Sequence, residues 1–511
     1  MCWTNTHTLR ALLLGLVASV TYGKLVIDVA DREVRTAEIR CDGPAFTHTH
    51  SLTSTTLHTS SVPVQLAVYP VKLLERTKLT VRNAGPGDAE VFALCSHASA
   101  AQGAAEVQVA EIDTNNPEMA NEMDPKGSAA GRSVSLPDGV ECVDYGLLSP
   151  LKEGEMRDLV ILTTRTDHVV AHPRARKQLE VPMVLVSVPE VLFSMYEIVE
   201  EKTQVKLASE KEATKTSEGG RSFTQEKDTL TLETMKNVEP FTSGTMKLHF
   251  ELTKPLLRAT SLERDIYVSH WGTVRIQELY DVRNDASAIK GEFSRADFLL
   301  KDEGTLGGAL QFRAGLPSGA FDIRYRDEIG NISTSTVARS KNDQVKMMGL
   351  GLEPRFPLFG GWHTKFEVSY SLGLEWLVRR GETGLYEMVF TQVPSILDVV
   401  YENIVTKIHL PEGSTLVEPP KLDNQRDLQV GEERTFLSVL PRPVVTVRQT
   451  NVVSDPVATP IAEIKYAYQP WLKFDKVLAA VASSVVVGTV YQVLASVDLG
   501  GAAPSSKAKK S

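Results

Sequence analysis

One tripeptide in this 511-residue chain has the residue types that a known covalent modification requires. Asn331, Ile332 and Ser333 form Asn-X-Ser, the acceptor sequence for an N-linked glycan in secretory proteins. The glycan joins the side-chain amide, so the asparagine must be exposed, and Gly330 directly before it favours a turn. Every other asparagine in the chain lacks Ser or Thr two residues later. The sequence therefore predicts N-glycosylation at Asn331.

Residues that could catalyse a reaction or bind a metal do not converge in the sequence. His48 and His50 have the spacing that places two imidazoles on one strand face, as some metal sites require. They lie near His58 in a stretch rich in Thr and Ser without a matching carboxylate or cysteine, which favours an exposed polar strand. Asp327 and Glu328 are neighbours on an expected strand and point to opposite faces, which favours ion pairs over a catalytic pair. We expect no catalytic residue, no metal site and no cofactor; an enzyme of unknown type is a competing interpretation.

The N-terminus has the three parts of a secretory signal peptide. Arg10 is followed by an apolar run over residues 11–20 and then by the small residue Gly23. That run is too short to cross a hydrocarbon core of about 30 Å. We expect residues 1–23 to be removed, so that the mature chain begins near Lys24 in an oxidising compartment.

Three cysteines would remain in the mature chain after Cys2 is lost with the signal peptide. Cys41, Cys95 and Cys142 are an odd number, so at most one intramolecular disulfide forms among them and one thiol is left over. Their spacing does not resemble that of zinc ligands. The sequence predicts one disulfide without choosing the pair.

A second apolar run, residues 477–497, has no ionised side chain and is long enough to cross a bilayer as a helix at about 1.5 Å per residue. Trp471 and Lys473 precede it, as interfacial anchors do. Small and hydrogen-bonding residues recur every fourth position on one face of this expected helix: Ala480, Ser484, Gly488 and Gln492. Such a face favours packing against another membrane helix, and tolerated polarity is the alternative.

The tail after this helix, residues 498–511, is basic, and positive charge favours the cytosolic side of a membrane. Lys507 and Lys509 have the spacing of dilysine signals that return membrane proteins to the endoplasmic reticulum, although a merely soluble basic tail is the alternative. With the signal peptide, this predicts a single-pass protein of the endoplasmic reticulum membrane. The bulk of the chain would be luminal and the C-terminus cytosolic.

Composition and periodicity indicate folded β-rich domains. The chain has 42% hydrophobic and 23% charged residues, and its formal net charge of -9 argues against a nucleic-acid partner. Short segments of period-two alternation dominate, and residues 395–405 are the best candidate for a helix before the membrane. The predicted fold is mainly β, with two luminal β-sandwich-like domains and then a single C-terminal transmembrane helix.

Polar stretches without periodicity set the expected domain limits. The first domain is placed at residues 24–228, with a surface insertion at about 96–132, and the second at residues 229–467. The boundary lies in residues 200–227, which are rich in Lys, Glu, Thr and Ser.

Four segments of the chain have a distinctive sequence: VSHWG at residues 268–272, GEFSR at 291–295, YRDEIGNISTST at 325–336 and RFPLFGGW at 355–362. Together they resemble the ribophorin I family, whose members belong to the oligosaccharyltransferase of the endoplasmic reticulum. The resemblance is strong over residues 268–411 and weaker but collinear outside them. The aromatic residues and paired glycines of the last segment predict a core or domain-seam bend, or alternatively a platform for a partner.

The resemblance implies a non-catalytic subunit of the complex that transfers a lipid-linked oligosaccharide to asparagine. It implies two luminal β-rich units before one membrane span, and glycan at the position of Asn331 in some relatives. The implied partners are the catalytic and accessory subunits, nascent polypeptides, the translocon and membrane lipid. The implied role is structural assembly and substrate presentation. A single-pass β-rich adhesion or receptor module of the cell surface or secretory pathway is the competing interpretation.

Overall fold

The computed structural model describes residues 57–60, 62–68, 72–83, 88–97, 104–113, 116–123, 125–128, 137–209, 211–215, 221–300, 302, 306–339, 347–381, 384–392, 394–420, 426–434, 440–454 and 461–496. The expected signal peptide at residues 1–23, Cys41, His48, His50, and the tail with Lys507 and Lys509 lie outside the described residues.

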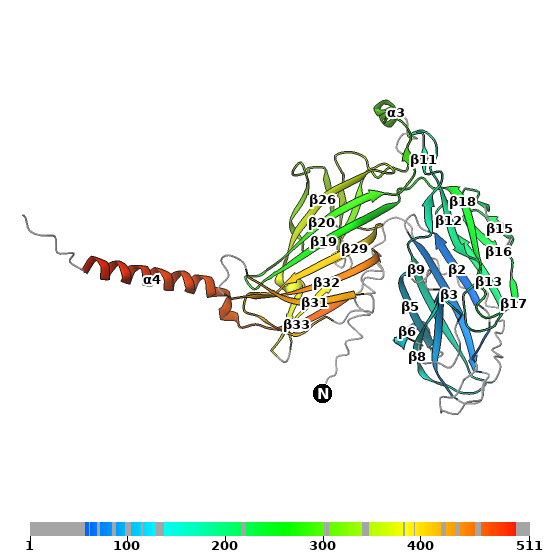
Figure 1. The fold of residues 1–511 in the computed structure, drawn as a ribbon, viewed down its shortest axis with the longest axis horizontal. Coiled ribbons are helices and arrows are strands. Elements are labelled where there is room, and N and C mark those ends of the chain that lie inside the picture. Colours follow the sequence, from blue (N-terminus) through cyan, green and yellow to red (C-terminus); the bar gives the residue numbers. More distant parts are fainter. Residues whose placement is uncertain are drawn as a thin grey trace, which may run out of the picture.

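Strands form most of the described structure, in two units, and one long helix extends from the second unit (Figure 1). The expected mainly β fold with a C-terminal apolar helix is confirmed.

The first unit contains a ten-stranded sheet with the central order β15-β16-β13-β1-β3-β9-β5-β6, a four-stranded sheet β10-β12-β18-β14 and a three-stranded sheet β4-β8-β7. Its strands are β1 (Leu57–Ser60), β2 (Val62–Val68), β3 (Leu73–Asn83), β4 (Ala89–His97), β5 (Ala104–Asp113), β6 (Asn116–Glu122), β7 (Pro125–Ser128), β8 (Val140–Leu151), β9 (Met156–Arg165), β10 (Val169–Ala171), β11 (Ala175–Arg176), β12 (Met183–Pro189), β13 (Ile198–Lys206), β14 (Thr214–Lys215), β15 (Phe223–Glu226), β16 (Thr229–Leu232), β17 (Met235–Val238) and β18 (Thr245–Glu251).

One hydrophobic core joins these sheets. Every second residue of β3 is buried, including Leu79 and Val81, because successive strand residues point to opposite faces. Val186 of β12 pairs with Leu248 of β18, and both contribute to the same core. The first unit is therefore a sandwich with its own interior.

The second unit is built on a seven-stranded sheet, β23-β26-β20-β19-β29-β32-β31, with the smaller sheets β22-β25-β24 and β27-β28-β33-β30. Its elements are β19 (Leu257–Ser269), β20 (Thr273–Asn284), β21 (Ala288–Ile289), α3 (Arg295–Leu300), β22 (Phe312–Pro317), β23 (Phe321–Asp327), β24 (Ser335–Arg339), β25 (Met347–Leu352), β26 (His363–Gly373), the 3-10 turn η2 (Leu374–Trp376), β27 (Val378–Arg380), β28 (Tyr386–Thr391), β29 (Val400–His409), β30 (Thr415–Glu418), β31 (Arg426–Glu433), β32 (Arg442–Val453), β33 (Ile461–Ala467), the 3-10 turn η3 (Pro470–Phe474) and α4 (Asp475–Ser496).

Register aligns apolar residues across the large sheet. Ile266 of β19 pairs with Ile276 of the antiparallel β20 and with Ile408 of the parallel β29, and all three are buried. Residues of the two smaller sheets, such as Leu350 and Ile464, belong to the same core. The second unit is thus also a layered β structure with one interior.

The first core extends further along the chain than the expected boundary at residue 228. Leu230, Phe250 and Leu256 belong to the first core, whereas the second core begins at Leu257. The reason is strand pairing, since β16 and β17 pair with β13 and β18 pairs with β12. The polar stretch chosen as a linker lies within the first unit.

Two further expectations are wrong. The segment expected as a surface insertion, residues 96–132, contains β5, which pairs with β9 and buries Val109 in the core. Residues 395–405, expected as a helix, lead into β29, which lies between β19 and β32. Tyr401 and Ile404 are buried there. A strand in the middle of a sheet can be apolar on both faces, so its apolar residues can recur at the three-residue spacing of a helix.

Candidate functional site

The sequon lies on an exposed turn that a neighbouring carboxylate organises. Asp327 Oδ1 accepts hydrogen bonds from the backbone N–H groups of Ile329 and Gly330, at 3.0 and 2.9 Å. Arg355 pairs with Asp327 and donates to the carbonyl oxygen of Asn331 at 3.1 Å. The hydrogen bond from Arg355 holds the pKa of the Asp327 carboxyl below its ordinary value. Asp327 is therefore a turn-forming ion-pair partner, and the Asn331 side chain is left exposed.

The start of α4 is attached to the second unit without a spacer. Leu472 of η3 is buried, and a Cβ on Gly413 would approach its side chain to 3.1 Å. Lys476 Nζ lies 2.9 Å from Glu412 Oε1, and Arg442 lies 3.4 Å from the same oxygen. These contacts fix where the helix leaves the β structure.

An aromatic cage beside this joint encloses His270. Its Nε2 lies 3.0 Å from the Tyr466 hydroxyl, and its ring stacks on Tyr468 at 4.2 Å between ring centroids. Burial, and then the charge of Lys473, lower the pKa of His270 to about 4. The imidazole is neutral near pH 7, so the cage is a packing element at the helix base.

The predicted packing face of α4 is exposed. The helix is long and apolar enough to cross a membrane, and none of its residues is buried. Ala480, Ser484, Gly488 and Gln492 lie along it, and a Cβ on Gly488 would meet nothing within 4 Å. The Ser484 hydroxyl donates to the Ala480 carbonyl at 2.8 Å. Packing of this face against another helix stays a prediction.

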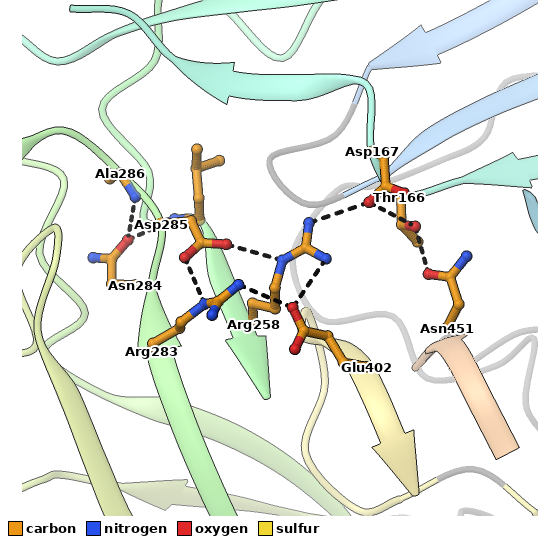
Figure 2. Close-up of polar contacts among 10 residues, drawn as sticks. Thr166, Asp167, Arg258, Arg283, Asn284, Asp285, Ala286, Glu402 and Asn451 are labelled. Carbon is orange, nitrogen blue, oxygen red and sulfur yellow. Dashed lines mark hydrogen bonds and ion pairs between the residues drawn. The ribbon is translucent and has the colours of Figure 1, made fainter. Parts of the chain in front are cut away.

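A polar seam connects the two units (Figure 2). Arg258 of β19 lies 3.5 Å from Asp167 of the first unit, 2.9 Å from Asp285 and 3.6 Å from Glu402. Arg283 bridges the last two carboxylates at 2.8 and 2.9 Å. The seam thus places an arginine of the second unit against a carboxylate of the first.

Further contacts extend the connection between the units. Thr166 of the first unit donates to Asn451 of β32 at 2.5 Å, as Figure 2 shows. The short strands β11 and β21 pair in parallel, and Ser287 donates to the carbonyl oxygen of Pro173 at 2.6 Å. Gln178 exchanges two hydrogen bonds with the backbone of Ser294, at 2.8 and 3.0 Å. Side chains far apart in sequence make this seam, so no local motif could have revealed it.

We expect Arg258→Ala to loosen the seam by about 1–2 kcal/mol, because three carboxylates lose a partly buried cation. Hydrogen exchange followed by mass spectrometry on the full chain should show faster exchange in peptides that contain β11 and β21. Arg324→Ala is the matched control, since it removes an exposed ion pair with Asp322 on β23, which takes no part in the seam. Equal exchange in the Arg258 variant and the native chain would contradict the prediction.

Each unit also encloses a buried Arg–Glu pair that sequence reasoning missed. Arg221 lies 3.0 Å from Glu201 in the first unit, and Arg264 lies 3.0 Å from Glu278 in the second. All four side chains are buried. The sequence does contain an indication of the second pair: Arg264 alternates with the apolar Leu262 and Ile266 on β19, so its side chain points to the same buried face.

The structure selects one disulfide from the open possibilities. Cys95 of β4 and Cys142 of β8 are directly paired across the strands and joined by an S–S bond of 1.96 Å. Both are buried. Within the described residues, no cluster of His, Cys, Asp and Glu has the arrangement of a metal site.

Comparison with known protein families gives one match that covers most of the chain. The family model described as Ribophorin I matches residues 72–495, which include most of both units and nearly all of α4. The chain belongs to the ribophorin I family. A single family match thus extends across the two β units and the apolar helix.

Individual relatives of this ribophorin I family member are similar over part of their length. The chain is 32% identical over 332 residues to the Arabidopsis thaliana protein named dolichyl-diphosphooligosaccharide--protein glycosyltransferase subunit 1A, covering 63% of this chain and 51% of that one. It is 32% identical over 329 residues to subunit 1 of Caenorhabditis elegans, covering 61% and 53%. The chain therefore spans about half the length of these curated relatives. An M1 zinc metallopeptidase structure from Deinococcus radiodurans is 14% identical with a TM-score of 0.21, covering 43% of this chain and 49% of that one, which carries no conclusion.

Three of the segments that carry the ribophorin I resemblance lie at turns and bends of the second unit. Residues 268–272 comprise the end of β19 and the turn to β20 beside the α4 base, and residues 325–336 comprise the end of β23, the sequon turn and the start of β24. In the aromatic segment, Phe359 is fully buried, and a Cβ on Gly360 would collide with the Ser287 carbonyl oxygen. This segment is part of the core next to the seam, as one of the two sequence interpretations expected.

Proposed function

We propose that this protein is a non-catalytic subunit of an oligosaccharyltransferase complex in the endoplasmic reticulum membrane. The observation that carries the proposal is the ribophorin I family match across both units and α4. Relatives named as subunits of a dolichyl-diphosphooligosaccharide–protein glycosyltransferase support it. The chain anchors through α4 and contributes structure to the complex, with nascent polypeptides presented near the catalytic subunit and the translocon.

Isolation of the complex tests this function. Full-length tagged protein is extracted from membranes with a gentle detergent, affinity purified, and its partners are identified by mass spectrometry. We expect the catalytic and accessory oligosaccharyltransferase subunits to co-purify in near-stoichiometric amounts. Recovery of the chain without any of them, or with cell-surface partners, would overturn the proposal and favour the adhesion or receptor interpretation.

The small-residue face of α4 is proposed as the contact with a neighbouring membrane helix. Gly488→Leu places a large side chain on this face, whereas Val487→Leu makes a similar hydrophobic change next to it. We expect the Gly488 variant to lower recovery of partner subunits by about tenfold, in line with the roughly 1–2 kcal/mol that contacts between packed membrane helices contribute. Equal recovery for both variants would rule out this face.

Asn331 is proposed as a glycan acceptor on the luminal side. Its turn is exposed and the sequon continues into an exposed Ser333. We expect Asn331→Gln and Ser333→Ala to abolish the mobility shift that glycosidase treatment produces in the native protein. Ser335→Ala is the matched control, because it removes a nearby serine outside the sequon and should keep the shift. A shift that persists in the Asn331 variant would refute the site.

Retrieval by the C-terminal lysines is proposed as part of localisation, together with removal of the signal peptide at residues 1–23. Lys507→Ser combined with Lys509→Ser should release part of the protein to the cell surface when the complex subunits are limiting. Surface biotinylation measures that fraction. No release under those conditions would contradict retrieval by these two lysines.

A further inference from the structure

Exposed aromatic side chains gather at one end of the second unit. In the part of the chain that the structure describes, six tryptophan and phenylalanine side chains are exposed, and only Phe356 lies elsewhere. The others, here called the aromatic collar, are Trp271, Phe321, Trp376, Trp471 and Phe474. Exposed rings of this size are uncommon on a surface that faces only water, so their clustering needs an explanation.

The β structure brings these rings together from distant parts of the sequence. Trp271 lies on the turn between β19 and β20, and Gly272 of this turn accepts a hydrogen bond from Leu374 of η2 at 2.9 Å. Trp376 lies against Gly319, where an added Cβ would meet the indole at 2.3 Å. Phe321 begins β23 opposite Ser371, two residues before β26 ends. All three rings therefore lie at the same end of the large sheet.

The helix base completes the collar. Phe474 meets Trp271 edge to face, with 5.4 Å between ring centroids, and Trp471 is exposed on the same 3-10 turn. Lys473 extends over both the Trp271 and Phe474 rings, at 5.8 and 5.0 Å from their centroids. The ammonium group and the indoles form one amphipathic surface beside the first residue of α4, from which the helix projects (Figure 1).

A bilayer crossed by α4 must bring its surface to this end of the sheet. The helix begins at Asp475, directly after Phe474, so no spacer separates the collar from the membrane-crossing segment. Tryptophan is enriched at the level of lipid headgroups, where its ring is half solvated, and lysine side chains there direct their charge to phosphate. The size, exposure and placement of the collar match that environment.

We propose that the aromatic collar is seated in the lipid headgroup layer, so that the second unit contacts the membrane through its sheet end as well as through α4. This contact goes beyond the proposed function and depends only on α4 crossing the bilayer. The occupant of the surface is phospholipid. The sequence analysis expected an interfacial anchor only next to the helix, at Trp471, whereas the structure adds residues up to 200 positions earlier, at Trp271.

Fluorescence quenching by brominated lipid tests the proposal. The full chain is reconstituted in phosphatidylcholine vesicles whose acyl chains carry bromine close to the headgroup, or close to the midplane, or not at all. We expect quenching to be stronger with the shallow bromine. Trp271→Phe and Trp376→Phe should each lower the quenched emission by about a third, since three interfacial tryptophans share it.

Trp362→Phe is the matched control, because Trp362 packs against Phe359 near the seam, away from the collar. It should leave the quenched emission unchanged. If Trp471→Phe removes all lipid quenching while the Trp271 and Trp376 variants remove none, the sheet end does not touch lipid and the proposal is overturned. Aqueous iodide gives a second reading in the same vesicles. Free access of iodide to Trp271 would likewise overturn the lipid contact and indicate a surface left open for a protein.

Discussion

Glu278→Gln is expected to lower the free energy of unfolding of the second unit by about 3–5 kcal/mol, because it leaves a buried arginine without its counter-charge. The Arg264 and Glu278 side chains are only 3% and 0% exposed, and their nearest atoms are 3.0 Å apart. Tyr280 also donates to the Glu278 carboxylate, at 2.7 Å. The amide cannot balance the guanidinium charge, so the variant retains the cost of dehydrating Arg264.

Denaturant titration of the full chain measures this effect through tryptophan fluorescence. The four tryptophans of the described residues, Trp271, Trp362, Trp376 and Trp471, all lie in the second unit or at the helix base. The emission therefore reports the unfolding of that unit.

Two variants make the Glu278 result specific. Asp322→Asn is the matched acid-to-amide control, since the ion pair of Asp322 with Arg324 is exposed and should contribute less than about 1 kcal/mol. Combining Glu278→Leu with Arg264→Met removes both buried charges and should recover much of the lost stability. A Glu278→Gln cost no larger than that of Asp322→Asn would show that the pair is not the buried charge couple described above.

Cys142→Ala is expected to destabilise the first unit by about 4 kcal/mol, because the disulfide closes a loop that would otherwise be free in the unfolded chain. Cys95 and Cys142 are separated by 47 positions in sequence. Reductant should destabilise the native protein by a similar amount and leave the variant almost unaffected.

Circular dichroism and limited proteolysis of β4 and β8 follow this change, because the tryptophans report the other unit. Cys41→Ser is the control, as Cys41 is not part of the disulfide. It should keep the native sensitivity to reductant. A first unit that unfolds at the same denaturant concentration with and without the disulfide would contradict the prediction.

Local patterns predicted those features that depend on neighbouring residues. Alternating burial along β3 and β19, the apolar helix and the exposed turn at Asn331 all follow from short-range periodicity and turn chemistry. The Glu278 and Arg264 pair could have been suspected too, because each charge interrupts an apolar phase on its strand. The sequence could not show that these two residues pair with each other, because it is the pairing of β19 with β20 that brings them together.

Features that depend on strand order were beyond local patterns. The boundary between the domains was misplaced because the polar stretch at residues 200–227 lies between two paired strands. β12 precedes this stretch and β18 follows it, yet the two pair with each other. Asp167 and Arg258 meet at the seam although 91 positions separate them, and neither has a distinctive neighbourhood in the sequence. The aromatic collar likewise depends on three strand ends meeting, which only the sheet topology fixes.

The firm joint at Leu472, Glu412 and Lys476 has a mechanical consequence. With no flexible neck between the helix and the β structure, rotation or tilt of α4 becomes rotation or tilt of the second unit as a rigid lever. The first unit is joined to the second at the seam, at the end of the second unit opposite α4, so it would move the furthest. A change in helix angle of a few degrees inside the bilayer would thus be amplified into a displacement far above its surface.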